Sequence, residues 1–188
     1  MTYILPFGQA HGDDAWRSGP KAARLSALSA AAFNVPTGFA VATDALDHFL
    51  DTNDLAAEAA RIIERIDASA AAELGEWPAR LRKLIQSGAL PEDLAQELRL
   101  ACAGLGGGAL ALRSSSTLED RADLSFAGQH DSFLNIASFD ACVEALKKVW
   151  ASLYSDRAMA YLRALDMSAQ PLRMGVVVQQ VVQPRRRS

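Results

Sequence analysis

The central stretch of the sequence reads Leu112-Arg113-Ser114-Ser115-Ser116-Thr117-Leu118-Glu119-Asp120, and after four further residues it continues as Ser125-Phe126-Ala127-Gly128-Gln129-His130-Asp131-Ser132-Phe133-Leu134-Asn135-Ile136. The apolar residues 109–112 predict a buried strand that runs directly into Arg113. A hydroxyl-rich turn and a carboxylate pair are expected to follow, and Gly128 then separates two segments that each carry a phenylalanine.

These residue types suit a polyphosphate ligand. The guanidinium of Arg113 offers a planar fork of donors that matches phosphate oxygens. The hydroxyls of residues 114–117 can donate hydrogen bonds to anions, and Gly128 lets the backbone come close to a ligand. An ordinary strand, polar loop and hairpin would give the same pattern, because serine-rich turns are common. The residues by themselves leave both interpretations open.

Length and composition limit the class of protein. The chain has 188 residues, which suffice for one domain or two small lobes, and half of them are apolar. A formal net charge of -3 gives no broad basic field, so nucleic acid is not an expected partner. No apolar run reaches the ~18 residues of a membrane helix. Residues 1–11 do not resemble a signal peptide, and we expect a cytoplasmic location with no membrane partner.

Two further features favour structural interpretations. Residues 104–108 read Gly-Leu-Gly-Gly-Gly without the following lysine of a phosphate-binding loop, and they precede a strand, so we interpret them as a helix stop and turn. Cys102 and Cys142 lack a Cys-x-x-Cys spacing and a nearby histidine, and we expect reduced, buried thiols.

Hydrophobic periodicity predicts that helices and strands share the chain. The expected strands cover residues 1–7, 39–43, 109–112 and 174–182, and the expected helices cover 21–32, 44–50, 54–67, 79–86, 91–104 and, as the longest, 138–165. Ser138 is a candidate cap of this last helix. Arg157 is expected to form a surface ion pair with Asp156 or another neighbour, although it could also contact phosphate.

Two polar residues outside the central stretch are candidate ligands. Lys21 follows Pro20 at a junction between a loop and a helix, where the helix N-terminus favours anions, although the residues alone favour a solvated surface lysine. Gln179 and Gln180 interrupt a run of β-branched residues that is typical of a buried strand. Buried amides need hydrogen-bond partners, which either an adenine ring or the protein itself could supply.

The central stretch resembles the nucleotide-binding segment of the phosphoenolpyruvate synthase and pyruvate phosphate dikinase family, which includes the rifampicin phosphotransferases. The family pattern is Arg-Ser-Ser-x-x-x-Glu-Asp, a short spacer and Ser-Phe-Ala-Gly-Gln, and residues 113–129 contain all of it. The family's Gly-Gly-Lys is here Gly19-Pro20-Lys21, and its Val-Pro-x-Gly-Phe stands at residues 35–39. Pro20 and Arg24 depart from the family, which has glycine and asparagine there.

The resemblance implies an α+β fold, namely the front part of an ATP-grasp-like nucleotide-binding domain with helices packed on short mixed sheets. It implies that Lys21 and Arg113 hold phosphates, that Gly128 and Ser132 line a covering loop, and that Gln179 lies near the nucleoside. We expect a helix-rich lobe over residues 1–104, a nucleotide-binding lobe over 105–183 with a lid at 125–136, and a basic tail at 184–188.

In this family ATP phosphorylates a carrier histidine, which then passes the phosphoryl group to an acceptor such as pyruvate or a rifamycin. The resemblance therefore implies ATP and Mg²⁺ as cofactors and a phosphohistidine-carrying domain or subunit as partner. The metal ligands and the carrier histidine are expected outside this chain, which would then be incomplete for turnover. Glu119 and Asp120 could bind metal, but a structural or solvated pair fits as well. A stand-alone, non-catalytic nucleotide-binding or regulatory module is the alternative.

Overall fold

The computed structural model describes residues 2–8, 14–68, 76–116, 132–164 and 173–182 and has an α+β fold, as expected. The strands are β1 (Ile4–Pro6), β2 (Gly38–Val41), β3 (Leu110–Ser116), β4 (Ser132–Ile136) and β5 (Met174–Gln180). The helices are α1 (Asp14–Ser18), α2 (Pro20–Ala30), α3 (Asp44–Thr52), α4 (Ala56–Ala68), α5 (Trp77–Ser87), α6 (Glu92–Gly104), α7 (Phe139–Ser152) and α8 (Asp156–Ala164). None of these helices is long and apolar enough to cross a membrane.

The described strands form one five-stranded sheet in the order β1-β2-β5-β3-β4, and every neighbouring pair is antiparallel. The expectation of short mixed sheets was therefore wrong. The last strand in sequence, β5, lies between β2 and β3 and joins strands from before and after residue 105 into a single sheet. Its continuous run of β-branched residues reflects burial on both faces.

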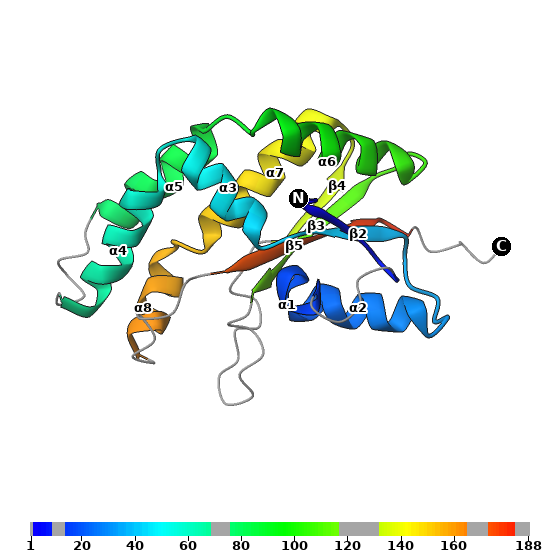
Figure 1. Cartoon of the computed structure of the whole chain (residues 1–188), viewed down its shortest axis with the longest axis horizontal. Coiled ribbons are helices and arrows are strands. Elements are labelled where there is room, and N and C mark those ends of the chain that lie inside the picture. The colour runs from blue at the N-terminus through cyan, green and yellow to red at the C-terminus, as the bar shows by residue number, and fades with distance from the viewer. Residues whose placement is uncertain (1, 9–13, 69–75, 117–131, 165–172, 183–188) are drawn as a thin grey trace.

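Helices cover both faces of this sheet. Figure 1 shows α1 and α2 on one side, which we call the α2 face, and α3, α6 and α7 on the other, which we call the helical face. Alternate residues of β5 point to opposite faces of the sheet. Val176 and Val178 belong to the large core under the helical face, whereas Val177 belongs to a small cluster with Ala22 of α2. The large core includes Trp150 of α7, whose ring centroid lies 5.3 Å from that of Phe49 in α3.

Residues 114–116 continue β3 and are not the turn that the sequence suggested. Their hydroxyl side chains are buried, and β3 pairs with β5 without interruption as far as the pair Ser116–Met174. These serines form a strand despite their turn propensity, because pairing with β5 satisfies the backbone hydrogen bonds. Their small side chains also allow α1 and α2 to approach the strand closely.

The single long helix expected at residues 138–165 is two helices. The chain leaves α7 after Ser152, and α8 begins at Asp156, where the hydroxyl of Ser155 accepts a hydrogen bond of 3.2 Å from the amide of Ala158. This cap starts a new helix in a sequence whose apolar pattern continues through the break. The expected cap at Ser138 is confirmed, since its hydroxyl accepts from the amide of Ala141 at 3.2 Å.

The glycine run ends α6, as predicted. Gly106, Gly107 and Gly108 all have positive φ, and the side-chain amide of Gln180 donates to the carbonyl oxygens of Leu105 and Gly107. Both cysteines are free thiols; Cys142 is buried, whereas Cys102 is only half-buried. Their sulfur atoms lie 3.9 Å apart across α6 and α7, a proximity that the sequence spacing did not indicate.

The backbone between α1 and α2, which we call the α1–α2 junction (Ser18 and Gly19), lies directly on the α2 face of the sheet. A Cβ atom on Gly19 would come within 2.9 Å of the carbonyl carbon of Ser115, and closer still to its oxygen. A Cβ atom on Gly175 would meet the carbonyl group of Ser18 in the same way. Ser115 and Gly175 are register partners on β3 and β5, so both contacts fall at one point of the sheet. Two glycines therefore allow backbone to pack on backbone.

We predict that Gly19→Ala lowers the free energy of unfolding by about 3 kcal/mol, because the new Cβ overlaps Ser115 and because φ of 75° with ψ of 162° is a conformation that glycine adopts far more easily than alanine. Gly104→Ala is the matched control, since no atom lies within 4 Å of the added Cβ at the end of α6. Urea unfolding followed by circular dichroism measures both variants. Equal stability of the two would show that the junction does not pack as described.

Candidate nucleotide-binding site

Strand register brings three of the expected site residues to the α2 face. Arg113 of β3 lies opposite Val177 of β5 and opposite Ser132 of β4, and Ala111 lies opposite Gln179. Directly opposed residues of an antiparallel pair point to the same face, and residues two apart on a strand also share a face. Since Val177 packs in the small cluster beneath α2, the side chains of Arg113, Ser132 and Gln179 all belong to this side of the sheet.

Lys21 reaches the same region from α2. Its ammonium group donates a hydrogen bond of 2.6 Å to the carbonyl oxygen of Ser114, the residue that follows Arg113. The serine hydroxyl of Ser115 accepts a hydrogen bond of 3.2 Å from the amide of Ala22, so β3 caps the first turn of α2 from a distant part of the chain. The first turn of α2 carries no acidic residue. No acidic side chain of this turn therefore offsets the positive end of the helix dipole, which lies beside β3.

The two cations differ in how they are held. Arg113 is exposed, and its guanidinium makes no hydrogen bond or ion pair with another residue of the described chain. Lys21 is half-buried and is fixed to the backbone of β3. An arginine that projects from a sheet without a carboxylate partner keeps its bidentate donor fork available for a ligand. Together the two residues provide a fixed and an available cation on one face.

Gln179 of β5 is a buried residue on this face of the sheet. Its side chain is 7% exposed, and its amide nitrogen donates to the carbonyl oxygen of Pro36 over a long 3.5 Å. The neighbouring Gln180 points to the helical face and binds the glycine turn. The two glutamines that the sequence presented as a pair thus have separate surroundings, and only Gln179 lies on the side of Arg113.

Part of the expected site lies outside the described residues. Gly128 and the carboxylates Glu119 and Asp120 fall in this portion, as do residues 125–131 of the expected lid. The remainder of the lid, residues 132–136, forms the edge strand β4 and pairs with β3. Within the described ranges, no group of three or more histidine, cysteine, aspartate or glutamate side chains could hold a metal ion.

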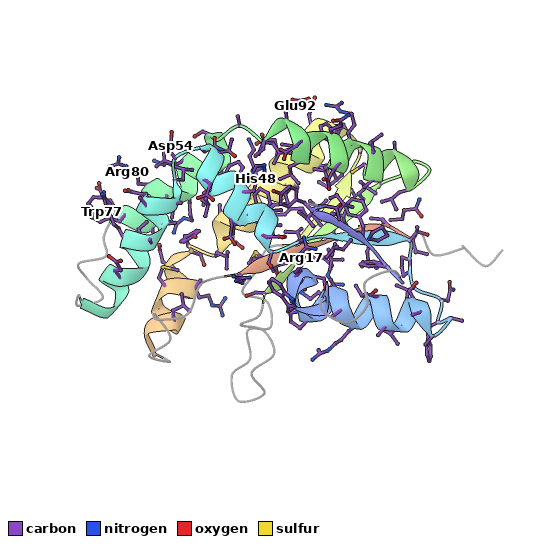
Figure 2. All side chains as sticks on the ribbon, in the orientation of Figure 1. Arg17, His48, Asp54, Trp77, Arg80 and Glu92 are labelled. Atoms are coloured by element: carbon purple, nitrogen blue, oxygen red, sulfur yellow. The ribbon has the colours of Figure 1, made fainter. Side chains whose placement is uncertain are left out.

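Sequence reasoning missed the residues that hold the α1–α2 junction in place. Arg17 is buried, binds Asp44 at the start of α3 at 2.8 Å and donates to the carbonyl oxygen of Thr2 at 2.7 Å. Its own carbonyl oxygen accepts from the amide of Thr43 at 2.7 Å. Figure 2 labels Arg17 at α1, close to the sheet. Polar spacing gave no signal for this role, because the partner acid lies 27 residues away in sequence.

Comparison of the sequence with known proteins identifies a family and several relatives. Residues 17–188 match the family described as pyruvate phosphate dikinase, AMP/ATP-binding domain. The chain is 31% identical over 188 aligned residues to the probable phosphoenolpyruvate synthase of Methanothermobacter thermautotrophicus, covering 97% of this chain and 28% of that protein. It is 36% identical over 166 residues to the phosphoenolpyruvate synthase of Escherichia coli, covering 84% of this chain and 21% of the relative.

A further relative is the rifampicin phosphotransferase of Streptomyces sviceus, which is 33% identical over 184 residues, with 97% of this chain and 21% of the relative covered. These relatives are enzymes by name, and the chain spans between 21% and 28% of the length of the three. The resemblance carried by residues 113–129 is therefore confirmed. The match extends over nearly the whole sequence, and the chain belongs to the pyruvate phosphate dikinase AMP/ATP-binding domain family.

Proposed function

We propose that the chain binds ATP on the α2 face of the sheet, with the phosphates between Lys21 and Arg113 and the nucleoside toward Gln179. The observation that carries this proposal is the exposed guanidinium of Arg113, which has no partner among the described residues and lies on the same face as the N-terminus of α2. Membership in an AMP/ATP-binding domain family supports the ligand class. The cations and the helix terminus together favour a polyanion at this place over a neutral ligand.

Each residue has a separate part in this proposal. Arg113 would grip phosphate oxygens with two parallel hydrogen bonds, and Lys21 would add a point charge whose position β3 fixes. The hydroxyl of Ser132, which lies opposite Arg113, would donate a hydrogen bond to the same phosphate group. Gln179 would exchange its long hydrogen bond to Pro36 for a partner on the nucleoside. Positioning of this kind supplies much of the catalysis in phosphoryl transfer.

The larger activity that we propose is that of the relatives. The chain would be the ATP-binding portion of a phosphotransferase with an ATP-grasp-like domain, which phosphorylates a carrier histidine and then an acceptor such as pyruvate or a rifamycin. The printed names of the relatives, phosphoenolpyruvate synthase and rifampicin phosphotransferase, support this reaction class. Mg²⁺ would neutralise phosphate charge. The described residues offer no cluster of metal ligands.

Replacing Arg113 tests the proposed phosphate contact. We predict that Arg113→Ala weakens ATP binding at least tenfold, since about 1.5–3 kcal/mol is typical for hydrogen bonds to a charged group. Arg113→Lys should also bind poorly, because a lysine lacks the bidentate fork. Isothermal titration with ATP measures each affinity.

The matched control is Arg99→Ala, which removes an exposed arginine that lies over the ring of Phe139 in another part of the molecule, 4.0 Å from the ring centroid. Its ATP affinity should equal that of the parent chain. Circular dichroism confirms that each variant is folded. An Arg113→Ala protein that is folded and binds ATP as tightly as the Arg99→Ala protein would refute the assignment.

Amide exchange tests whether β4 takes part in the proposed site. We predict that exchange in residues 132–136 slows when ATP is added, because a ligand held by Arg113 and Ser132 bridges β3 and β4 and suppresses opening of this edge strand. Residues 92–104 of α6 pack on the helical face and serve as the internal control, with no change expected. Identical exchange of β4 with and without saturating ATP would mean that the nucleotide does not contact this strand.

A further inference from the structure

A cavity of about 610 Å³ opens on the helical side of β4, away from the proposed ATP site. Its walls come from α5, from α7, from the turn at Ser155 and from the start of α8, and Phe133 of β4 also lines it. Phe133 directly follows Ser132, so the two side chains project from opposite faces of the same strand. The sheet itself therefore separates this cavity from the site proposed for ATP.

Basic side chains outnumber acidic ones among the residues that line the cavity. Arg82, Lys148 and Arg157 are basic, whereas Asp156 is the single acidic residue among the described residues that line the cavity. The acid is already engaged, because its carboxylate accepts a hydrogen bond of 2.9 Å from Arg82. Arg82 also donates to the carbonyl oxygen of Tyr154 at 2.6 Å, which fixes its guanidinium in the wall.

The other two cations have no acidic partner in the part of the chain that the structure describes. Lys148 and Arg157 are exposed, and no carboxylate of the described chain pairs with either. The ammonium group of Lys148 lies 6.0 Å from the centroid of the Phe133 ring, at the limit of a cation–π contact. The cavity thus carries an excess of two positive charges together with an apolar surface formed by Phe133 and Ala151.

We propose that this cavity is a second binding site and that its ligand is a small polyanion, carrying two or more phosphate or carboxylate groups. Three cations on three separate elements converge on one hollow, which a single charge would not neutralise. Lys148 and Arg157 hold the anionic groups, Arg82 adds a positive charge that is fixed in the wall, and the apolar surface receives the carbon skeleton of an organic anion. This inference does not depend on where ATP binds.

Titration of the full chain with pyrophosphate and with citrate tests the site. All measurements use the Arg113→Ala background, in which the site proposed for ATP is weakened. We expect both a calorimetric signal and amide chemical-shift changes confined to residues 82–86, 133 and 148–157. Binding of pyrophosphate alone identifies a phosphate ligand, binding of citrate alone identifies a carboxylate ligand, and either result supports the proposal.

Charge variants decide whether the named residues form the site. Lys148→Gln and Arg157→Gln should each weaken binding about tenfold. Their matched control is Lys83→Gln, an exposed lysine of α5 outside the lining, which should leave the affinity unchanged. Asp156→Asn should tighten binding severalfold, whereas Glu144→Gln, which changes net charge equally from an exposed position outside the cavity, should not.

Three results would overturn the proposal. The first is the absence of any binding in the Arg113→Ala background. The second is equal weakening by Lys83→Gln and Lys148→Gln, which would indicate attraction to the net charge alone. The third is a set of shifted amides that excludes both α7 and α8. Circular dichroism of each variant ensures that a loss of binding does not reflect a loss of fold.

Discussion

The packing of the α1–α2 junction on the pair Ser115–Gly175 is the contact on which the α2 face depends. Because neither Gly19 nor Gly175 has a Cβ atom, the junction backbone lies against β3 and β5 with no side chain between them. Ser115 then caps α2, and Lys21, one residue before the capped amide, reaches the carbonyl oxygen of Ser114. A shift of this junction would move the lysine away from the strand that carries Arg113. The relative placement of the two cations is therefore set by backbone contact.

The alternation of side chains along the strands gives the two faces of the sheet different roles. On β3 and β5, even-numbered residues such as Leu112 and Val176 face the helical layer, and odd-numbered residues such as Arg113 and Val177 face α2. The helical face buries the large core and provides the rigid support. The α2 face buries a smaller cluster and leaves Arg113 and Ser132 exposed. One strand thus contributes to both stability and the candidate site at successive positions.

Much of this organisation could be predicted from sequence, and the failures have physical causes. Periodicity located most elements within a few residues, and the pattern at 113–129 identified the family. Local propensity suggested a turn at residues 114–116 because it does not take into account the pairing with β5, which begins 58 residues after Ser116. The break before α8 was missed because the apolar spacing continues through it, and this spacing does not reveal that Ser155 caps a new helix. Strand order was beyond sequence reasoning, since β5 joins β2 across a separation of more than a hundred residues.

The ion pair between Arg82 of α5 and Asp156 of α8 shows the same limit of sequence reasoning. Adjacent residues on a helix point in different directions, so Asp156 and Arg157 cannot face one another although they are neighbours in sequence. Asp156 instead binds Arg82 on α5, 74 residues away, where the packing of α5 against α7 brings the arginine to the turn before α8. Arg82 therefore pairs with the one carboxylate among the described lining residues, and Arg157 and Lys148 have no counter-charge within the described chain. The basic character of this cavity therefore follows from helix geometry acting on a chain whose overall charge is negative.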